Sequence, residues 1–139
     1  MGVRVKIRID LDDRSTEAIA LINTAFEGDV PEVLVPIQLA ERLNVWPSLP
    51  GGTIVETYRS VSGLMRVYRI RGAKVSLVAE GIKPRYIDSY LVISEQADEV
   101  LINDQLISSL GLVIEDPAKG LWRIKGEEKI RKSEPYRFS

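Results

Sequence analysis

Residues 53–93 read as one β-strand after another, which restricts the chain to a fold built mainly from sheet. Four segments rich in Val, Ile, Leu and Tyr follow one another: TIVETYR, LMRVYRIR, AKVSLVA and YIDSYLVI. Short runs of this kind, separated by turn residues, are typical of strands. The breaks fall at residues 60–63, at Gly72 and at residues 81–84, and we expect hairpin turns at Gly63 and Gly72. The sequence therefore predicts a mostly β protein.

The first third of the chain continues this pattern. Residues 3–9 alternate Val or Ile with charged residues, which predicts a half-buried strand, and a turn follows at residues 12–15. Residues 16–22 (TEAIALI) are ambiguous, because their propensities favour a helix while their length suits a strand. The apolar residues 33–35 predict a further short strand.

Two short helices are expected within this β framework. Pro36 is predicted to stand at the first position of one helix, in the segment PIQLAERLNV, whose apolar residues share one face. Asp104 is predicted to cap the second helix, QLISSL, and Gly111 to end it. A last hairpin is expected within residues 112–125.

No linker-like stretch divides the chain. We therefore expect one domain at residues 1–125, followed by a C-terminal tail at residues 126–139. The tail has few apolar residues, and its Lys and Arg residues are balanced by Glu. It is expected to be mobile or to lie on a partner, and to be solvated rather than a nucleic-acid-binding arm.

The 139 residues contain no Cys and no His, which narrows the possible chemistry. Disulfides, thiolate nucleophiles, thiolate zinc sites and Ser–His–Asp catalysis are excluded. Catalysis would have to use carboxylates, hydroxyls, Lys, Tyr or backbone groups. Asp10, Asp12 and Asp13 are interpreted as a solvated turn, and Ser60 and Ser62 as turn formers rather than nucleophiles. We expect neither a metal nor a cofactor.

The charge of the chain is nearly balanced, with 19 basic and 20 acidic residues. This balance offers no broad electrostatic attraction to nucleic acid or to an acidic membrane. The sequence has no apolar run of about 18 residues, and the charged residues of its first strand are unlike a signal peptide. We expect a cytoplasmic protein that binds neither nucleic acid nor membrane. The lack of Cys, together with only six Asn and Gln residues, favours a heat-adapted source.

Two six-residue segments echo each other. Residues 21–26 read LINTAF and residues 101–106 read LINDQL, so each is an apolar strand that enters a polar loop. A short helix follows at once in the second case and after another strand in the first. The echo indicates two pseudo-equivalent halves.

The surroundings of both segments resemble a known family. The stretch LINTAFEGDVPEVLVPIQLAERLNV resembles the active-site segment of the retropepsin-like aspartic proteases, where an apolar strand runs into Asp-Thr-Gly before another strand, Pro and a short helix. The stretch EVLINDQLISSLGLVIEDPAKGLWRI resembles the closing segment of that family, and residues 53–80 stand where the family carries its flap hairpin. The resemblance covers about residues 15–125. It implies a closed β-barrel of the acid protease fold with one or two short helices.

The chain differs from the family at the positions of the catalytic motif and in the closing segment. Asn23 stands at the position of the catalytic Asp, Thr24 keeps the family residue, and Ala25 replaces Gly. In the closing segment, Asn103 and Asp104 replace Gly and Arg. The family mechanism needs two carboxylates that share a proton, and an amide cannot exchange one near neutral pH. We therefore expect no peptide hydrolysis at this site.

A single motif of this kind supplies half a site, so the resemblance implies a twofold homodimer. Two Asn23 side chains can hydrogen-bond across the axis without the repulsion of two carboxylates. Thr24 would hydrogen-bond across the interface, and the methyl group of Ala25 would narrow the floor of the cleft.

The resemblance also implies a cleft for an extended peptide. We expect its contacts at Glu27 and Gly28 on the floor, and at Val61, Ser62 and Gly63 at the tip of the flap hairpin. Glu27 and Asp29 flank the motif and are candidates for a substitute catalytic carboxylate, but solvated loop positions are the better interpretation.

Three hypotheses about function remain open at this point. The first is a non-catalytic homodimer, a pseudo-protease that binds peptide or serves as a structural dimer. The second is an active aspartic endopeptidase, in which another carboxylate acts or a natural Asp has been exchanged for Asn23. Ala25 argues against such an exchange, because one change already inactivates the site. The third is a β-rich domain of unrelated function with a coincidental motif.

Overall fold

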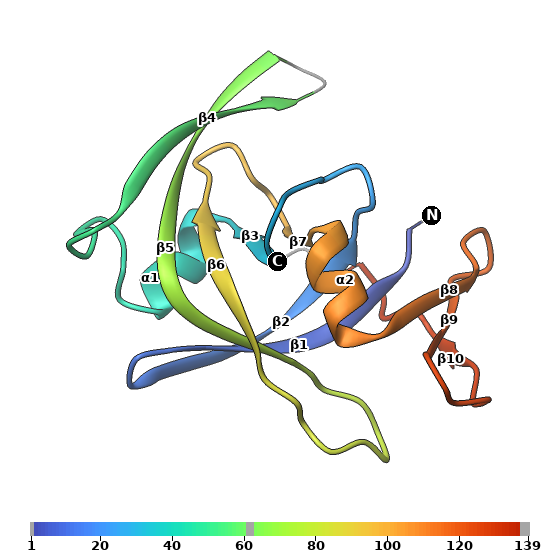
Figure 1. Cartoon of the computed structure of the whole chain (residues 1–139). Helices are drawn as coiled ribbons and strands as arrows, with labels where there is room; N and C mark the ends of the chain where they lie inside the picture. The colour runs from blue at the N-terminus through green and yellow to red at the C-terminus, as the bar shows by residue number, and fades with distance from the viewer. Residues whose placement is uncertain (1, 61–62, 137–139) are drawn as a thin grey trace.

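The computed structural model describes residues 2–60 and 63–136 of the chain (Figure 1). Ten strands and two short helices lie within this part, and their order along the chain is β1 (Arg4–Leu11), β2 (Arg14–Ile22), β3 (Glu32–Val35), α1 (Ile37–Arg42), β4 (Ile54–Ser60), β5 (Gly63–Leu77), β6 (Ile87–Ile93), β7 (Val100–Ile102), α2 (Asp104–Leu110), β8 (Leu112–Asp116), β9 (Leu121–Ile124) and β10 (Arg131–Lys132). The prediction of a mostly β protein is confirmed.

Six of the strands close into a barrel. They are hydrogen-bonded in the order β1-β2-β7-β3-β6-β5, and β5 pairs back with β1 to complete the ring. The segment 16–22, which was ambiguous between helix and strand, belongs to β2 and pairs with β1 along its whole length. Tertiary pairing decides this segment, because a strand of the barrel buries its apolar side chains.

The barrel encloses the main hydrophobic core. Val5, Ile7 and Ile9 of β1 are fully buried and Leu11 is 3% exposed. The half-buried strand predicted from the alternation of residues 3–9 is therefore confirmed. Each side chain of this size stabilises the fold by roughly 1.5–3 kcal/mol when it leaves water. Helices α1 and α2 add Leu39, Leu106 and similar residues to the same core.

Strand β5 is one continuous strand of 15 residues, so the hairpin turn predicted at Gly72 is wrong. Gly72 lies inside β5 with φ 95°, at the point where the register to β6 shifts between Ile70 and Ala73. A glycine in a strand interior with this conformation marks a β-bulge, which bends the strand. The bend lets one end of β5 pair with β1 in the barrel while the other end pairs with β4.

Strands β4 and β5 form a hairpin that extends beyond the barrel. Within the described residues β4 pairs only with β5, in a register from Ile54 opposite Arg69 to Ser60 opposite Gly63. Figure 1 shows this hairpin standing apart from the other strands. Gly63, where a hairpin turn was predicted, is the first residue of β5 and pairs with Ser60. The predicted contact residues Val61 and Ser62 lie outside the described residues.

Both predicted helices are present, each with its start shifted by one residue. Pro36 is the N-cap of α1, with φ −75° and ψ 168°, rather than its first helical residue. Asn103, not Asp104, is the N-cap of α2, and its side chain accepts a hydrogen bond from the backbone of Leu106. Gly111 ends α2 in the left-handed conformation, φ 73°, as predicted.

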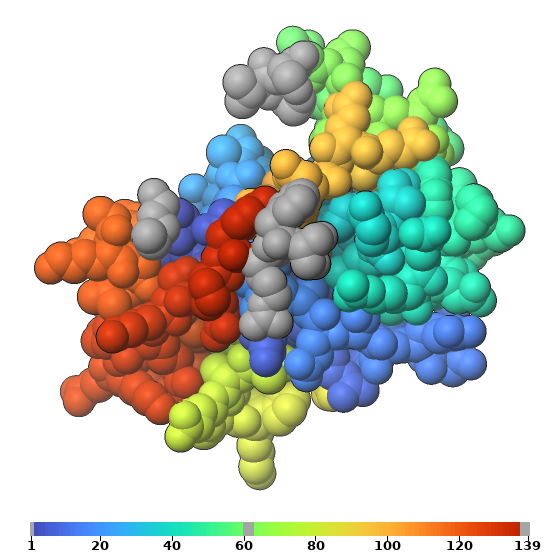
Figure 2. Space-filling model, turned by 180° about the vertical axis from the view of Figure 1, so that it is seen from behind, coloured from blue at the N-terminus to red at the C-terminus, as the bar shows by residue number. Residues whose placement is uncertain are grey.

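Residues 131–134 of the predicted tail pack against earlier parts of the same chain. Strand β10 pairs with β9, the indole Nε1 of Trp122 donates to the carbonyl of Lys132 at 3.2 Å, and Glu134 N donates to the carbonyl of Arg4 at 2.8 Å. The guanidinium of Arg131 also lies over the Trp122 ring. Figure 2 shows the C-terminal segment, in red, lying against the body of the protein.

None of the helices in residues 2–60 and 63–136 has the length and apolar character needed to cross a membrane.

Candidate functional site

The two echoing segments lie side by side in the wall of the barrel. Strand β7 runs between β2 and β3, parallel to β2 and antiparallel to β3. In the β2–β7 register Leu21 pairs with Leu101 and Ile22 with Ile102, so the two Leu-Ile-Asn sequences align residue by residue. Two asparagines, Asn23 and Asn103, therefore follow neighbouring strand ends.

Asn23 shapes the loop that follows β2. Its backbone N donates to the carbonyl of Ile102 at 3.2 Å, and its side-chain Oδ1 accepts a hydrogen bond from Ala25 N at 3.1 Å. Thr24 and Ala25 are exposed, so the loop presents these residues at the surface. The Asn23 amide can hydrogen-bond but cannot take or give a proton near neutral pH, which leaves this position without a general acid or base.

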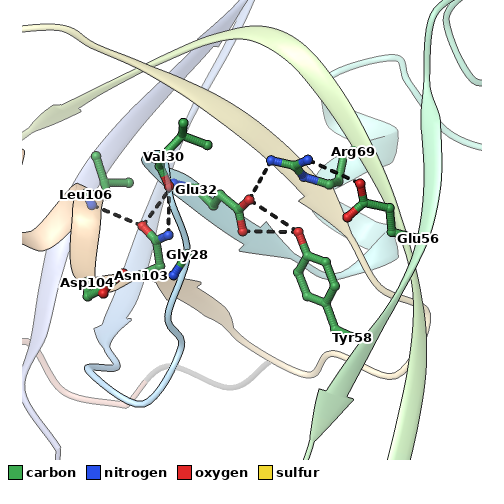
Figure 3. Close-up of polar contacts among 9 residues, drawn as sticks. All are labelled: Gly28, Val30, Glu32, Glu56, Tyr58, Arg69, Asn103, Asp104 and Leu106. Carbon is green, nitrogen blue, oxygen red and sulfur yellow. Dashed lines mark hydrogen bonds and ion pairs between the residues drawn. The ribbon is translucent and has the colours of Figure 1, made fainter.

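Asn103 is completely buried and braces the same loop (Figure 3). Its Oδ1 accepts from the backbone N of Glu32 at 2.9 Å and of Leu106 at 3.0 Å, and its Nδ2 donates to the carbonyl of Val30 at 2.9 Å. One side chain thus caps α2 and ties the end of the loop to the start of β3. This role was missed because the sequence pointed to the neighbouring Asp104 as the cap.

Asp104 holds the middle of the loop. Its carboxylate oxygen accepts from Gly28 N at 3.1 Å, and its backbone N donates to the carbonyl of Phe26 at 3.1 Å. Gly28 also lies close to Asn103, since a Cβ on Gly28 would stand 2.9 Å from Asn103 Nδ2. Asn103 and Asp104 therefore position loop 23–31 together.

A cavity of about 590 Å³ lies between loop 23–31 and the β4–β5 hairpin. It is lined by Ala25, Phe26, Glu27, Gly28, Asp29, Val30, Glu32, Glu56, Thr57, Tyr58, Arg59 and Arg69. The predicted contact residues Glu27 and Gly28 are thus brought together with the inner side of the hairpin, and Ala25 joins them. Gly63 lies at the far end of the hairpin, where β5 begins.

A charged cluster that the sequence did not predict forms one wall of this cavity. Glu32 is only 4% exposed, and its carboxylate accepts hydrogen bonds from Arg69 at 2.7 Å and from the Tyr58 hydroxyl at 3.2 and 3.3 Å (Figure 3). Arg69 also contacts Glu56 at 3.4 Å and lies over the Tyr90 ring at 4.0 Å. A charge inside the otherwise apolar run VPEVLV was the signal available in the sequence.

The environment of the cluster alters its ionisation. Burial, the largest influence, raises the pKa of Glu32 above its ordinary value, against the attraction of Arg69 and the hydrogen bond from Tyr58. Burial also raises the pKa of the Tyr58 hydroxyl, and the nearby Glu32 carboxylate adds to this effect. Tyr58 is therefore a hydrogen-bond donor at every pH near neutral.

Within the described residues, the acidic side chains form no group of three that could hold a metal ion. Asp10 instead pairs with Arg8 at 3.1 Å, and Asp12 adopts a positive φ of 54° in the turn between β1 and β2.

Comparison with known proteins assigns the chain to no family, because neither a protein-family model nor a curated protein matches it.

Proposed function

We propose that the chain is a degenerate member of the retropepsin-like aspartic proteases, and that it forms a homodimer which binds an extended peptide without cleaving it. One observation carries this proposal: Asn23 follows β2 beside the parallel strand β7. The loop that it opens lines, from Ala25 onward, a cavity whose other side is the β4–β5 hairpin. The motif order that suggested the family in the sequence thus corresponds to a closed barrel, a loop, a short helix and a hairpin.

The absence of hydrolysis follows from the residue at position 23. An aspartic protease needs one carboxylate to activate water and a second, protonated one to polarise the peptide carbonyl. Asn23 in two copies would supply two amides in that place, and these can hydrogen-bond to each other at no cost in charge. The exposure of Thr24 and Ala25 leaves this loop accessible to a second copy.

Sedimentation equilibrium at micromolar concentration tests the dimer. We expect twice the monomer mass of 15.6 kDa for the natural chain, and the monomer mass for Thr24→Arg, which places a charge in the proposed interface. Ser15→Arg is the matched control, because Ser15 is exposed near the other end of β2. A monomeric natural chain would overturn the homodimer.

Peptide binding is tested with a fluorescein-labelled peptide that contains statine, the transition-state mimic of aspartic proteases. Fluorescence anisotropy should show saturable binding that the unlabelled peptide reverses. If the labelled peptide shows no saturable binding to the dimer, the peptide-binding function is wrong and a structural role is left.

A second candidate function is an active endopeptidase that uses Glu32. Its favourable observation is a buried carboxylate with a raised pKa in the wall of the cavity. Against it, the Glu32 carboxylate is already engaged by Arg69 and Tyr58, two hydrogen-bond donors. Cleavage of unfolded protein by the natural chain that disappears in Glu32→Gln would favour this candidate.

A further inference from the structure

Strand β4 is joined to the barrel by its pairing with β5, which itself pairs with β6, and by side-chain contacts across the cavity. Within the described residues, β4 has no strand partner other than β5. Under the hairpin lies a small second core of Leu34, Val67 and Val92, on which Phe26 and Tyr58 pack from opposite sides of the cavity. The position of β4 above the cavity is therefore set by a small number of contacts.

Tyr58 makes the most direct of these contacts. It projects from β4 and donates its hydroxyl to both oxygens of the Glu32 carboxylate (Figure 3). Its ring lies 6.4 Å from that of Phe26. Glu32 begins β3 in the barrel, and Phe26 belongs to loop 23–31. Tyr58 thus connects the hairpin to both the barrel and the loop.

The contacts of Tyr58 with Glu32 and Phe26 lie at the cavity in which we propose that a peptide binds. Phe26, Glu32 and Tyr58 all line the cavity between loop and hairpin. A peptide strand laid between β4 and the loop would separate Tyr58 from Phe26 and break the bond to Glu32. Glu32 would keep its partner Arg69, at 2.7 Å, so its charge would stay paired after Tyr58 leaves.

We propose that Tyr58 is an autoinhibitory latch, which holds the β4–β5 hairpin closed over the cavity and must leave Glu32 before an extended peptide can bind. For its ligand this inference rests on the proposed peptide-binding function, but the latch itself is a property of the free protein. Binding is then weakened by the stability of the closed form, because only the open fraction is competent.

Tyr58→Phe tests the latch, since it removes the hydroxyl and keeps the ring against Phe26. Tyr90→Phe is the matched control: its ring also belongs to the second core, and in the described part of the chain its hydroxyl makes no bond to Glu32. Amide hydrogen exchange of residues 54–60 is measured first. We expect exchange about tenfold faster in Tyr58→Phe than in the natural chain, and no change in Tyr90→Phe. Equal exchange in all three proteins would overturn the latch.

Anisotropy with the labelled statine peptide is measured on the same proteins. We expect Tyr58→Phe to bind about tenfold more tightly, which corresponds to about 1.4 kcal/mol. Faster exchange without tighter binding would show that the contact is only structural, and would overturn the latch. If exchange accelerates in Tyr58→Phe but none of the three proteins binds the peptide, the latch stands and the peptide-binding function fails.

Discussion

The side-chain oxygen of Asn103 accepts a hydrogen bond from the backbone amide of Glu32 at 2.9 Å, across 71 residues of sequence. This bond joins the loop side of the site to the hairpin side. Asn103 hydrogen-bonds to Val30 in loop 23–31, and Glu32 accepts a hydrogen bond from Tyr58 of the β4–β5 hairpin. Both residues are buried, so neither partner can be satisfied by bulk water if the other is removed.

Asn103→Ala should therefore destabilise the protein strongly. The change removes the cap of α2, at about 1 kcal/mol, and leaves the buried backbone N–H of Glu32 without a partner, at roughly 1–3 kcal/mol. It also removes the hydrogen bond to the carbonyl of the exposed Val30. We expect a loss of about 3 kcal/mol in the free energy of unfolding, measured by urea denaturation. Gln105→Ala is the control, because Gln105 is exposed in the same helical turn and should cost less than about 0.5 kcal/mol. Similar losses in both variants would contradict the bracing role.

Gly28→Ala tests how closely the loop packs on Asn103. The added Cβ would stand 2.9 Å from Asn103 Nδ2, an atom that the hydrogen bond to Val30 holds in place. We expect a loss of roughly 1–3 kcal/mol in the free energy of unfolding from this overpacking. Gly51→Ala should cause no loss, because a Cβ there meets nothing within 4 Å. An unchanged stability of Gly28→Ala would show that the loop is free to move away from α2.

The strand periods made most of the barrel predictable, but not the connections that depend on distant partners. The alternation in residues 3–9 corresponds to β1 because one face of that strand fills the barrel. At Gly72 the sequence pattern is the same for a turn and a bulge, and only the pairing of β5 with β1, β4 and β6 decides between them.

The hydrogen bonds of Asn103, Asp104 and Glu32 could not be predicted from local sequence patterns. Asn103 and Asp104 are both good caps, and which of them acts depends on where β7 ends. Glu32 finds Tyr58 and Arg69 at separations of 26 and 37 residues, which no spacing rule connects. The resemblance directed attention to loop 23–31, while the charged wall opposite it comes from the packing of the hairpin.

The raised pKa of Glu32 gives stability a definite pH dependence. Between the ordinary value of 4.5 and the higher folded value, the folded protein binds more protons than the unfolded chain. The stability that this group contributes is therefore fully present below about pH 4.5 and is lost as the pH rises through the folded pKa. Urea unfolding should show the stability of the natural chain falling relative to Glu32→Gln over this window. Glu56→Gln, which keeps Glu32, should follow the natural chain. If the natural chain instead becomes more stable than Glu32→Gln as the pH rises, the raised pKa is contradicted.

If the proposed resemblance holds, placing Asp and Gly at positions 23 and 25 should produce peptidase activity. In Asn23→Asp with Ala25→Gly, the new carboxylate can accept the hydrogen bond from residue 25 that Asn23 now accepts at 3.1 Å. In the proposed homodimer, two copies would then place two carboxylates at the twofold axis, where they would share a proton. We expect the double variant to cleave unfolded protein at acidic pH in a manner that a statine inhibitor blocks. Asn23→Asp combined with Thr24→Arg, designed to prevent dimerisation, should stay inactive.

The most direct test of the account is a peptidase assay on the natural chain. The protein is incubated with a denatured protein substrate from about pH 3 to about pH 7, with and without the statine inhibitor, and the products are analysed by mass spectrometry. The proposed degenerate site, with the amide of Asn23 where a catalytic carboxylate would be needed, predicts no inhibitor-sensitive cleavage at any pH in this range. Cleavage that the inhibitor abolishes would contradict the central claim that this cleft binds peptide without hydrolysing it.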